Sequence, residues 1–532
     1  MRNNIFGYLF IIFIIGIMGF AIYKVNIKEE NKEERNKAAS QSSQNVEKIA
    51  EITLGIAEFD TINPIITNNR DVQDISKIIY EPLVNITQDY KIEECLATEV
   101  AKTNDTTYII KLRQKVKWSD GSKFTSNDVK FTIDRLKEDS NSVYKANVEH
   151  VKEVDIVDDY TVRIILSKKV PFFEYYLNFP ILSSNYYANE DFWNTSKNEA
   201  PVTTGSYKIS EVTSNTITLE KNETWWNKNE KEPFLEKITI NLYSTIAELY
   251  NAFKLGSIDL ITTENSSYQD YVGTIGYNTV EVEGREFIFL ALNMKSSRLQ
   301  DKNIRKAVRN AINAEEIVNN VYGNMYKQAN FPISFSNYLI DEKEENFFNS
   351  DEITNTLTTS GWTLKNGLWQ KIIEYKTTRL ELDLVVKQSD GYRVEVAKIL
   401  QIQLAEQGIL LNILEVSDEE YYRYLENKNY DMILGSITSS ITSDLSIYFG
   451  NGNLANFEND EAKEIVNYAD NINDANELKS KYERLYEIYN EEIPYIGIAR
   501  KKVMVLYNND LVGEINPNWY NLFYNMENWY KQ

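Results

Sequence analysis

The sequence contains one histidine, His150, and one cysteine, Cys95, among 532 residues. A catalytic triad of the Ser-His-Asp or Cys-His type needs a histidine base, so His150 would have to serve any of them. It precedes a Val/Lys/Glu segment that is typical of an exposed strand. One cysteine cannot form an internal disulfide, and together the two residues cannot build a Cys/His metal cluster. We therefore predict that Cys95 is a partly buried free thiol, and we expect no cofactor, no metal-ligating residues and no catalytic residues of the Ser-His or Cys-His type.

The 79 acidic residues leave one kind of catalysis open, because a pair of carboxylates hydrolyses glycosides without a histidine. These acids outnumber the 57 basic residues and give a net charge of -22. Such a charge repels phosphate backbones, so we do not expect a nucleic-acid partner. It is also the charge of an ordinary solubilising surface.

The N-terminus predicts the compartment. Residues Ile5 to Tyr23 carry no charge, and as a helix at ~1.5 Å per residue they would span about 28 Å, the thickness of a bilayer core. No small-x-small cleavage site and no cysteine follow this segment. We therefore predict an uncleaved transmembrane signal anchor over residues 1–27, a flexible linker over 28–48, and a folded body on the extracytoplasmic side.

Strand and helix patterns alternate along the body and predict the α/β class. Val154 to Leu166 is typical of a hairpin, and a capped helix is expected from Ser126. A long helix is predicted from Asp301 to about Tyr322. Strand, helix and strand patterns over 380–387, 392–407 and 409–416 predict a βαβ unit. A chain of this length needs more than one core, so we expect two lobes.

An ordered set of short motifs gives the chain a resemblance to family 5 of the extracellular solute-binding proteins, the oligopeptide, dipeptide and nickel binders of ABC importers. The most specific motif is VKWSDG followed by FT and DV. We interpret Trp118 as a core residue, Asp120-Gly121 as a turn, and Thr125 or Ser126 as the cap of the helix that follows. The others are FDTINPIIT with IIYEPLV, TTGSYKI, NETWW, GSIDL, FLALNMKSSRLQDKNIRKAVRNAIN, GW, RVEVAKILQIQLAEQGI, YDMIL and IPYIGIAR.

The resemblance implies a two-lobe clamshell of the periplasmic-binding-protein type, with the extra subdomain of cluster C. The first lobe would comprise residues 49–285, with the extra subdomain at about 86–194, and residues 504–532 would return to it. The second lobe would comprise 286–503, with the chain crossing between lobes near Glu286 to Asn293 and Ile496 to Val503.

The resemblance also indicates ligand-binding residues. The segment Asn68, Asn69 and Arg70 corresponds to the cleft-facing loop of the first lobe. Arg285, at the first crossing, could meet a ligand carboxylate or pair with a neighbouring Glu, and we favour pairing. An Asp that often follows the YDMIL-like strand in the family is replaced here by Ser440. Either Asp444 holds a peptide amine instead, or a different ligand is bound through Ser436, Ser439 and Ser440.

The function implied by the resemblance is capture of small peptides and delivery to the permease and ATPase subunits of an ABC importer, without catalysis. The alternative is a surface receptor for signalling peptides or another solute, on the same clamshell. A single histidine disfavours nickel or haem, although a metal inside an organic chelator needs no protein ligands. We expect a monomer, anchored by one span to the membrane of a low-GC Gram-positive bacterium.

Overall fold

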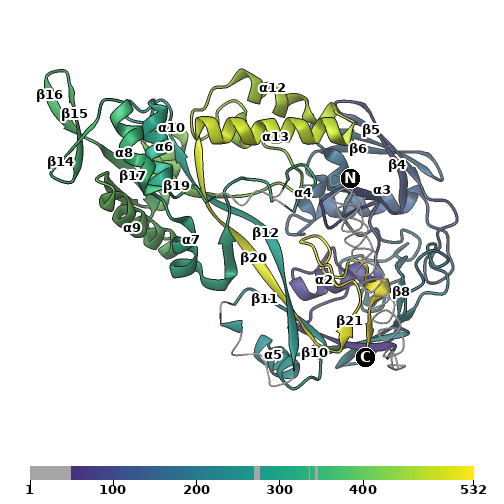
Figure 1. Cartoon of the computed structure of the whole chain (residues 1–532). Coiled ribbons are helices and arrows are strands. Elements are labelled where there is room, and N and C mark those ends of the chain that lie inside the picture. Colours follow the sequence, from purple (N-terminus) through teal and green to yellow (C-terminus); the bar gives the residue numbers. More distant parts are fainter. Residues whose placement is uncertain (1–48, 266, 269–275, 335, 342–345) are drawn as a thin grey trace, which may run out of the picture. The chain divides into compact units, whose positions relative to one another are not determined.

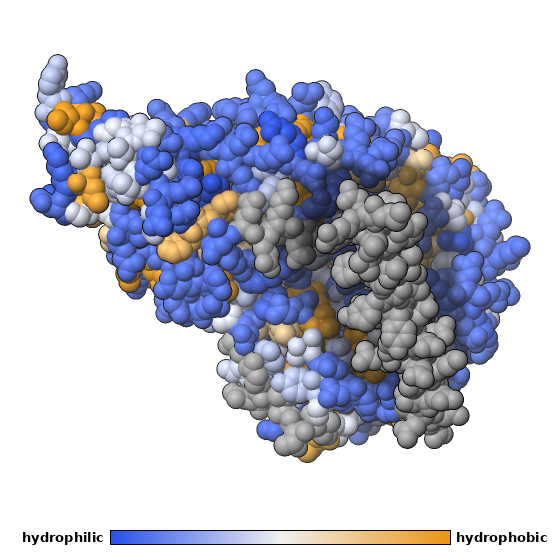
Figure 2. Space-filling view, in the orientation of Figure 1, coloured by the Kyte–Doolittle hydropathy of each residue, from blue (hydrophilic) through white to orange (hydrophobic). Residues whose placement is uncertain are grey.

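The computed structural model describes residues 49–265, 267–268, 276–334, 336–341 and 346–532 (Figure 1). The predicted anchor, Ile5 to Tyr23, and the linker over 28–48 lie outside these residues. Within them, no helix combines the length and the apolar character needed to cross a bilayer. Residues 50–530 form one compact unit that holds four clusters of buried hydrophobic side chains. This segment therefore has the core it needs to fold by itself. The face of the protein shown in Figure 2 is mostly hydrophilic where the residues are described.

The first lobe is built on a four-stranded sheet in the order β1-β10-β9-β8. β1 and β10 are parallel, whereas β10, β9 and β8 pair antiparallel. Alternate residues of β1 are buried, which places Ile52, Leu54 and Ile56 in the core. The elements around this sheet are β1 (Glu51–Ala57), α2 (Arg70–Ile79), β8 (Tyr207–Val212), β9 (Thr216–Lys221), β10 (Lys237–Tyr243) and α5 (Ile246–Lys254).

A second four-stranded sheet, in the order β4-β5-β7-β6, lies together with α3 in the segment that the sequence predicts as the extra subdomain, and we keep that name for it. Its members are β4 (Ala97–Asn104), β5 (Thr107–Leu112), α3 (Ser126–Glu138), β6 (Val151–Asp158) and β7 (Thr161–Leu166). The predicted hairpin is confirmed, because β6 and β7 pair antiparallel up to Asp158 and Thr161. The predicted cap is also confirmed: the backbone N–H of Thr125 donates to Asp128 over 2.8 Å, and the buried Trp118 indole donates to the same carboxylate.

The largest sheet has seven strands and extends through both lobes. Its central pair is β12 (Tyr277–Leu292) and β20 (Tyr495–Asn508), which run antiparallel side by side (Figure 1). The order is β11-β20-β12-β19-β17-β18, with β13 also paired to β20; the remaining members are β11 (Leu260–Thr263), β13 (Tyr326–Gln328), β17 (Glu381–Lys387), β18 (Leu410–Val416) and β19 (Met432–Thr438).

The second lobe packs helices on this sheet. The predicted βαβ unit is confirmed, because β17 and β18 are parallel and α9 (Gly391–Glu406) connects them. The other helices are α6 (Lys302–Ala311), α8 (Ser350–Thr359), α10 (Asp418–Asn427), α11 (Ser446–Phe449), α12 (Asp460–Tyr468) and α13 (Ala475–Glu492).

The single helix predicted from Asp301 to Tyr322 is wrong. α6 ends at Ala311, and α7 (Ala314–Ile317) followed by a π-helical turn (Val318–Tyr322) forms a separate segment. The cause is Asn313, whose side chain accepts from the backbone N–H of Glu316 and so caps a new helix. Asparagine competes with the helical backbone in this way, and it favours helix starts over helix interiors.

Two of the sequence motifs meet around a buried carboxylate, Glu81. Its side chain accepts hydrogen bonds from the indole N–H groups of Trp225, at 2.8 Å, and Trp226, at 2.9 Å. Arg113 lies over the Trp226 ring, 3.9 Å from its centroid. Burial raises the pKa of Glu81 from 4.5 to about 7, although both indoles oppose this shift. The residue therefore joins distant parts of the first lobe, and its raised pKa leaves it only partly ionised at neutral pH.

Glu81 should make stability depend on pH. Because its pKa is higher in the folded state than in the unfolded chain, its contribution to the free energy of unfolding is complete below pH 4.5 and is lost as the pH rises through about 7. The loss amounts to at most about 3 kcal/mol. We expect Glu81→Gln to flatten this part of the profile, measured by urea unfolding across that range. Glu223→Gln, at an exposed position of the NETWW motif that contributes both indoles, is the control; an unchanged slope in Glu81→Gln would contradict the assignment.

Candidate functional site

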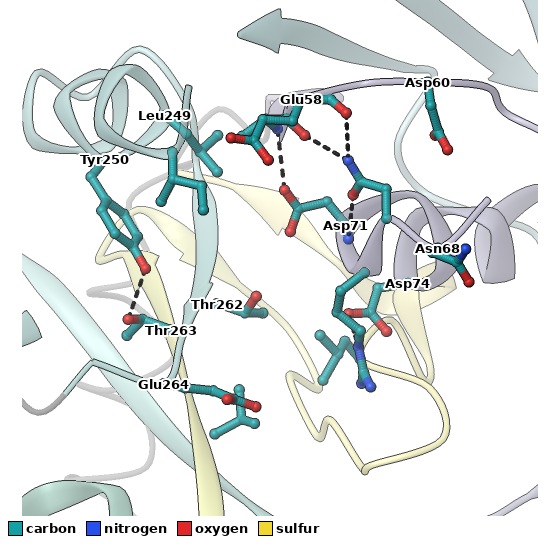
Figure 3. Close-up of a pocket in the computed structure, with 16 residues that line it drawn as sticks. Glu58, Asp60, Asn68, Asp71, Asp74, Leu249, Tyr250, Thr262, Thr263 and Glu264 are labelled. Atoms are coloured by element: carbon teal, nitrogen blue, oxygen red, sulfur yellow. Dashed lines mark hydrogen bonds and ion pairs between the residues drawn. The ribbon is translucent and has the colours of Figure 1, made fainter. Parts of the chain in front are cut away.

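The first lobe contains a cavity of about 630 Å³, which we call the lobe-one pocket (Figure 3). It opens between the loop after β1, the start of α2, the helix α5 and the end of β11. The lining residues are Ala57, Glu58, Asp60, Asn68, Asn69, Arg70, Asp71, Asp74, Ile246, Leu249, Tyr250, Thr262, Thr263, Glu264, Val503 and Leu522. A volume of this size falls in the range of small-molecule binding sites.

The start of α2 is fixed by Asn69. Its side-chain oxygen accepts from the backbone N–H groups of Asp71 and Val72, and its amide donates to the carbonyls of Ala57, at 2.7 Å, and Glu58, at 3.0 Å. Asn69 thus ties the helix to the loop after β1. Because these contacts occupy both its oxygen and its amide group, they describe a structural role for a residue that the sequence indicated as ligand-binding.

Arg70 and Asn68, unlike Asn69, have side chains that do not cap the helix α2. Arg70 donates to Asp74 over 2.8 Å and stacks on Trp519, 4.8 Å from the ring centroid. Asn68 is exposed at the rim of the pocket. The sequence-predicted segment therefore does border a cavity, with one side chain used as a cap, one in an ion pair and one facing solvent.

The lobe-one pocket is strongly acidic. Five carboxylates line it, Glu58, Asp60, Asp71, Asp74 and Glu264, against the single guanidinium of Arg70. Burial raises the pKa of Asp71 to about 6, and it also raises the pKa of Asp74 in spite of the Arg70 cation. Partly desolvated carboxylates gain most from a positive partner. The pocket is thus suited to a cationic group such as an amine.

A second, smaller cavity of about 50 Å³ lies where the lobes meet, and we call it the inter-lobe pocket. Tyr90, Tyr175 and Tyr520 reach it from the first-lobe side. The rest of the lining comes from the bulged part of β12, from β20 and from second-lobe loops, namely Glu283, Gly284, Arg285, Arg500, Pro332, Ile333, Ser334, Asn337, Ser439, Ser440, Ile441, Thr442 and Ser443. A buried ion pair, Glu283 with Arg500 at 3.6 Å, forms part of this lining.

Three sequence-predicted residues come together in the inter-lobe pocket. Arg285 donates from Nε to the carbonyl of Ser439 over 2.9 Å, and the Ser439 N–H donates back to the Arg285 carbonyl. Among the described residues Arg285 does not form the predicted ion pair with a Glu, because its Nε donates to the loop carbonyl instead. Ser440 contacts the hydroxyl of Tyr176 across the lobes at 3.1 Å, and the buried Ser439 hydroxyl has no hydrogen-bond partner among the described residues.

The two remaining predicted residues line neither pocket. Ser436 accepts from Arg393 at 2.5 Å. Asp444 accepts from the backbone N–H of Ser446, at 2.8 Å, and from its hydroxyl. Its carboxylate is therefore occupied by Ser446, the first residue of the short helix α11. Whether any of the predicted side chains contacts a ligand remains a prediction.

Sequence reasoning missed the acids Asp71, Asp74 and Glu264. A signal was present for Asp74, since Arg70 and Asp74 have the i, i+4 spacing of a helical ion pair. Arg500 also left a signal, as a charge inside the apolar strand IPYIGIAR, which is a mark of a buried pair. Among the described residues, no group of three or more His, Cys, Asp or Glu side chains could hold a metal ion.

The lobes are also joined away from the central strands, by a contact that we call the Asp470 latch. Asp470 of the second lobe is 1% exposed and lies 2.7 Å from the Lys102 ammonium and 2.9 Å from that of Lys169. Both lysines belong to the extra subdomain, and Lys102 also donates to Asn471. Within this inter-lobe ion pair the Asp470 carboxylate is shielded from solvent, whereas the two lysine side chains are partly exposed.

A two-lobed α/β architecture with paired crossing strands and an extra subdomain defines a binding protein of the periplasmic type. The profile of the bacterial extracellular solute-binding proteins, family 5, matches residues 91–457. The chain belongs to this family.

Individual relatives are distant in sequence. The chain is 23% identical over 482 residues to the oligopeptide-binding protein AppA of Bacillus subtilis strain 168, covering 86% of this chain and 88% of AppA. Its fold is similar to the unliganded open form of the periplasmic murein tripeptide-binding protein MppA, with a TM-score of 0.75, 17% identity, and coverage of 91% of this chain and 98% of that one. A nickel ABC transporter structure from Bacillus halodurans has a TM-score of 0.72 at 21% identity, covering 88% and 96%.

We expect Asp470→Asn to release the second lobe from the extra subdomain. The substitution leaves two ammonium groups without their shared carboxylate, which is costly when the site is partly buried. Small-angle scattering of the unliganded body, residues 49–532, should show a larger radius of gyration for this variant, and added salt should have less effect on it than on the parent. The control is Asp105→Asn, which removes an exposed carboxylate 3.5 Å from Lys102 within one lobe. Equal scattering curves for parent and Asp470→Asn would refute the latch.

Proposed function

We propose that this protein is the extracytoplasmic substrate-binding component of an ABC importer, and that it binds small peptides for delivery to a permease and its ATPase. Membership of family 5 supports this proposal, as does the naming of its relative AppA as oligopeptide-binding. The protein acts by binding and not by catalysis. The predicted helix at Ile5 to Tyr23 would hold it at the membrane, next to the permease.

The observation that carries the peptide assignment is the acidic lobe-one pocket. A peptide entering a cleft needs its amine met by carboxylates and its backbone groups paired, because burying either alone costs several kcal/mol. The pocket supplies the partly buried Asp71 and the buried Asp74 for an amine. Arg285, together with Ser439 and Ser440 of the inter-lobe pocket, is suited to the carbonyl and carboxylate groups of the same ligand.

Closure of the two lobes would follow, because the proposed ligand-binding groups belong to both of them. A ligand that contacts the lobe-one pocket and the loop after β19 has greater affinity for a state in which the lobes approach each other. The crossings near Glu286 to Asn293 and Ile496 to Val503 would act as the hinge, with the first lobe at 49–285 and 504–532 and the second between them.

Peptides should stabilise the body, residues 49–532. Any ligand that binds only the folded state, at 100 times its dissociation constant, adds about 2.7 kcal/mol to the free energy of unfolding. We expect a peptide library to contain members that raise the melting temperature, and mass spectrometry of the purified body to detect co-purified peptide. If peptides of every length fail in both measurements, the ligand class is wrong, although membership of the family is unaffected.

The amine should be bound in the lobe-one pocket. We expect Asp71→Asn to weaken peptides with a free amine about 10-fold more than acetylated ones, the effect of losing one charge-assisted contact. Because the pKa of Asp71 is raised to about 6, affinity for free-amine peptides should rise as the pH increases through 6, and Asp71→Asn should flatten this rise in calorimetric titrations.

Asp444→Asn is the matched comparison, because the sequence indicated this carboxylate for the same task. If Asp444→Asn selectively weakens free-amine peptides while Asp71→Asn does not, the amine site lies in the loop after β19, and our placement in the first lobe is wrong.

A further inference from the structure

A three-stranded antiparallel meander projects from the second lobe, and we call it the β-finger. It comprises β14 (Thr363–Lys365), β15 (Leu368–Ile373) and β16 (Lys376–Arg379) (Figure 1). Its base is held by Trp369, which is 2% exposed and donates from its indole to the carbonyl of Gln407 over 2.8 Å. The finger is therefore anchored at one end and free at the other.

The free end of the β-finger exposes apolar side chains. Tyr375 is 102% exposed and Ile372 is 73% exposed, while Ile373 and Leu364 are 43% and 49% exposed. Figure 2 shows hydrophobic atoms on this projecting part of the surface. Neither lobe uses these side chains for its core, so folding alone does not account for them.

The charge of the β-finger is opposite to that of the whole protein. Residues 363–379 hold the four basic residues Lys365, Lys371, Lys376 and Arg379 against one acid, Glu374, for a net charge of +3. The rest of the chain therefore carries -25, which together with the +3 of the β-finger gives the total of -22. Among the described residues, no carboxylate lies within ion-pair distance of Lys365, Lys376 or Arg379. The positive charge of the finger is thus available to an external partner.

The turn at the end of the β-finger adds an independent observation. Its two residues, Glu374 and Tyr375, have positive φ angles of 49° and 65°. Two-residue hairpin turns of this kind strongly prefer Asn and Gly. An aromatic residue placed there against the backbone preference, and then left fully exposed, is consistent with a functional use.

We propose that the β-finger docks on an anionic lipid bilayer, with Ile372 and Tyr375 in the headgroup region and its cations on the lipid phosphates. Exposed apolar side chains surrounded by lysine and arginine are the features that bind such surfaces. The four exposed apolar side chains, Leu364, Ile372, Ile373 and Tyr375, lie among cations that have no carboxylate partner, and this combination favours an anionic lipid surface. Because the remainder of the chain is repelled by anionic lipid, docking through the finger also orients the molecule.

Vesicle co-sedimentation of the body, residues 49–532, tests this proposal. We expect binding to vesicles of phosphatidylglycerol and phosphatidylcholine, little binding to phosphatidylcholine alone, and release by salt. The triple variant K365Q/K376Q/R379Q should lower the partition coefficient on the order of 100-fold, since each basic residue near an anionic surface contributes about 1 kcal/mol. The variant I372S/Y375S should also weaken binding, with unchanged thermal stability because both positions are exposed.

The matched controls change equivalent residues elsewhere. K115Q/K117Q/K123Q removes three exposed lysines from the first lobe, and Leu255→Ser removes a side chain that is 74% exposed. Both should bind vesicles like the parent. Failure of the parent to bind anionic vesicles at low salt, or equal loss in finger and control variants, would overturn the proposal. Binding that requires the importer's permease in the vesicle and persists in neutral lipid would overturn it in favour of a protein partner.

Discussion

The antiparallel pairing of β12 with β20 is the constraint on which both lobes depend. The two strands are paired in both lobes, and a bulge interrupts their register where Gly284, Arg285 and Glu286 stand opposite Lys501 alone. At the bulge the backbones approach so closely that a Cβ on Gly284 would lie 2.9 Å from the Lys501 carbonyl. The neighbouring Glu283 and Arg500 form a buried ion pair, which is costly to bury and costlier still to break. Both pockets border this strand pair, so their shape follows from it.

The fold was predictable from the sequence wherever the pattern was local. The hairpin of β6 and β7, the cap at Thr125 and the βαβ unit of β17, α9 and β18 all depend on periodicity and turn residues within one segment. The helix over 301–322 failed because Asn313 caps a new helix, although the apolar spacing on either side of it suggests continuity. In general, one competing side-chain hydrogen bond was enough to override the pattern.

The candidate site was harder to predict because its side chains are paired with residues far away in the chain. Arg285 meets the Ser439 carbonyl, 154 positions later, and no local pattern announces that partner. The motifs that indicated the family mostly hold the structure together. Asp431 of YDMIL, for example, accepts from Arg298 at 2.7 Å and from the backbone N–H of Asp383. Family identity and ligand identity are thus carried by different residues, and only the first could be obtained from the motifs.

The return of β20 to the first lobe affects the order in which the two lobes can fold. Residues of the second lobe are contiguous, so it can form its βαβ unit and helices as soon as its own segment is available. The first lobe must wait, because β11 and the start of β12 find their neighbour only in the last part of β20, where Leu260 faces Tyr507 and Tyr277 faces Asn508. Pairings this distant in sequence close slowly. Until they do, β11 and the start of β12 lack their hydrogen-bonding neighbour, and unpaired strand edges are the parts of a sheet protein most prone to aggregation.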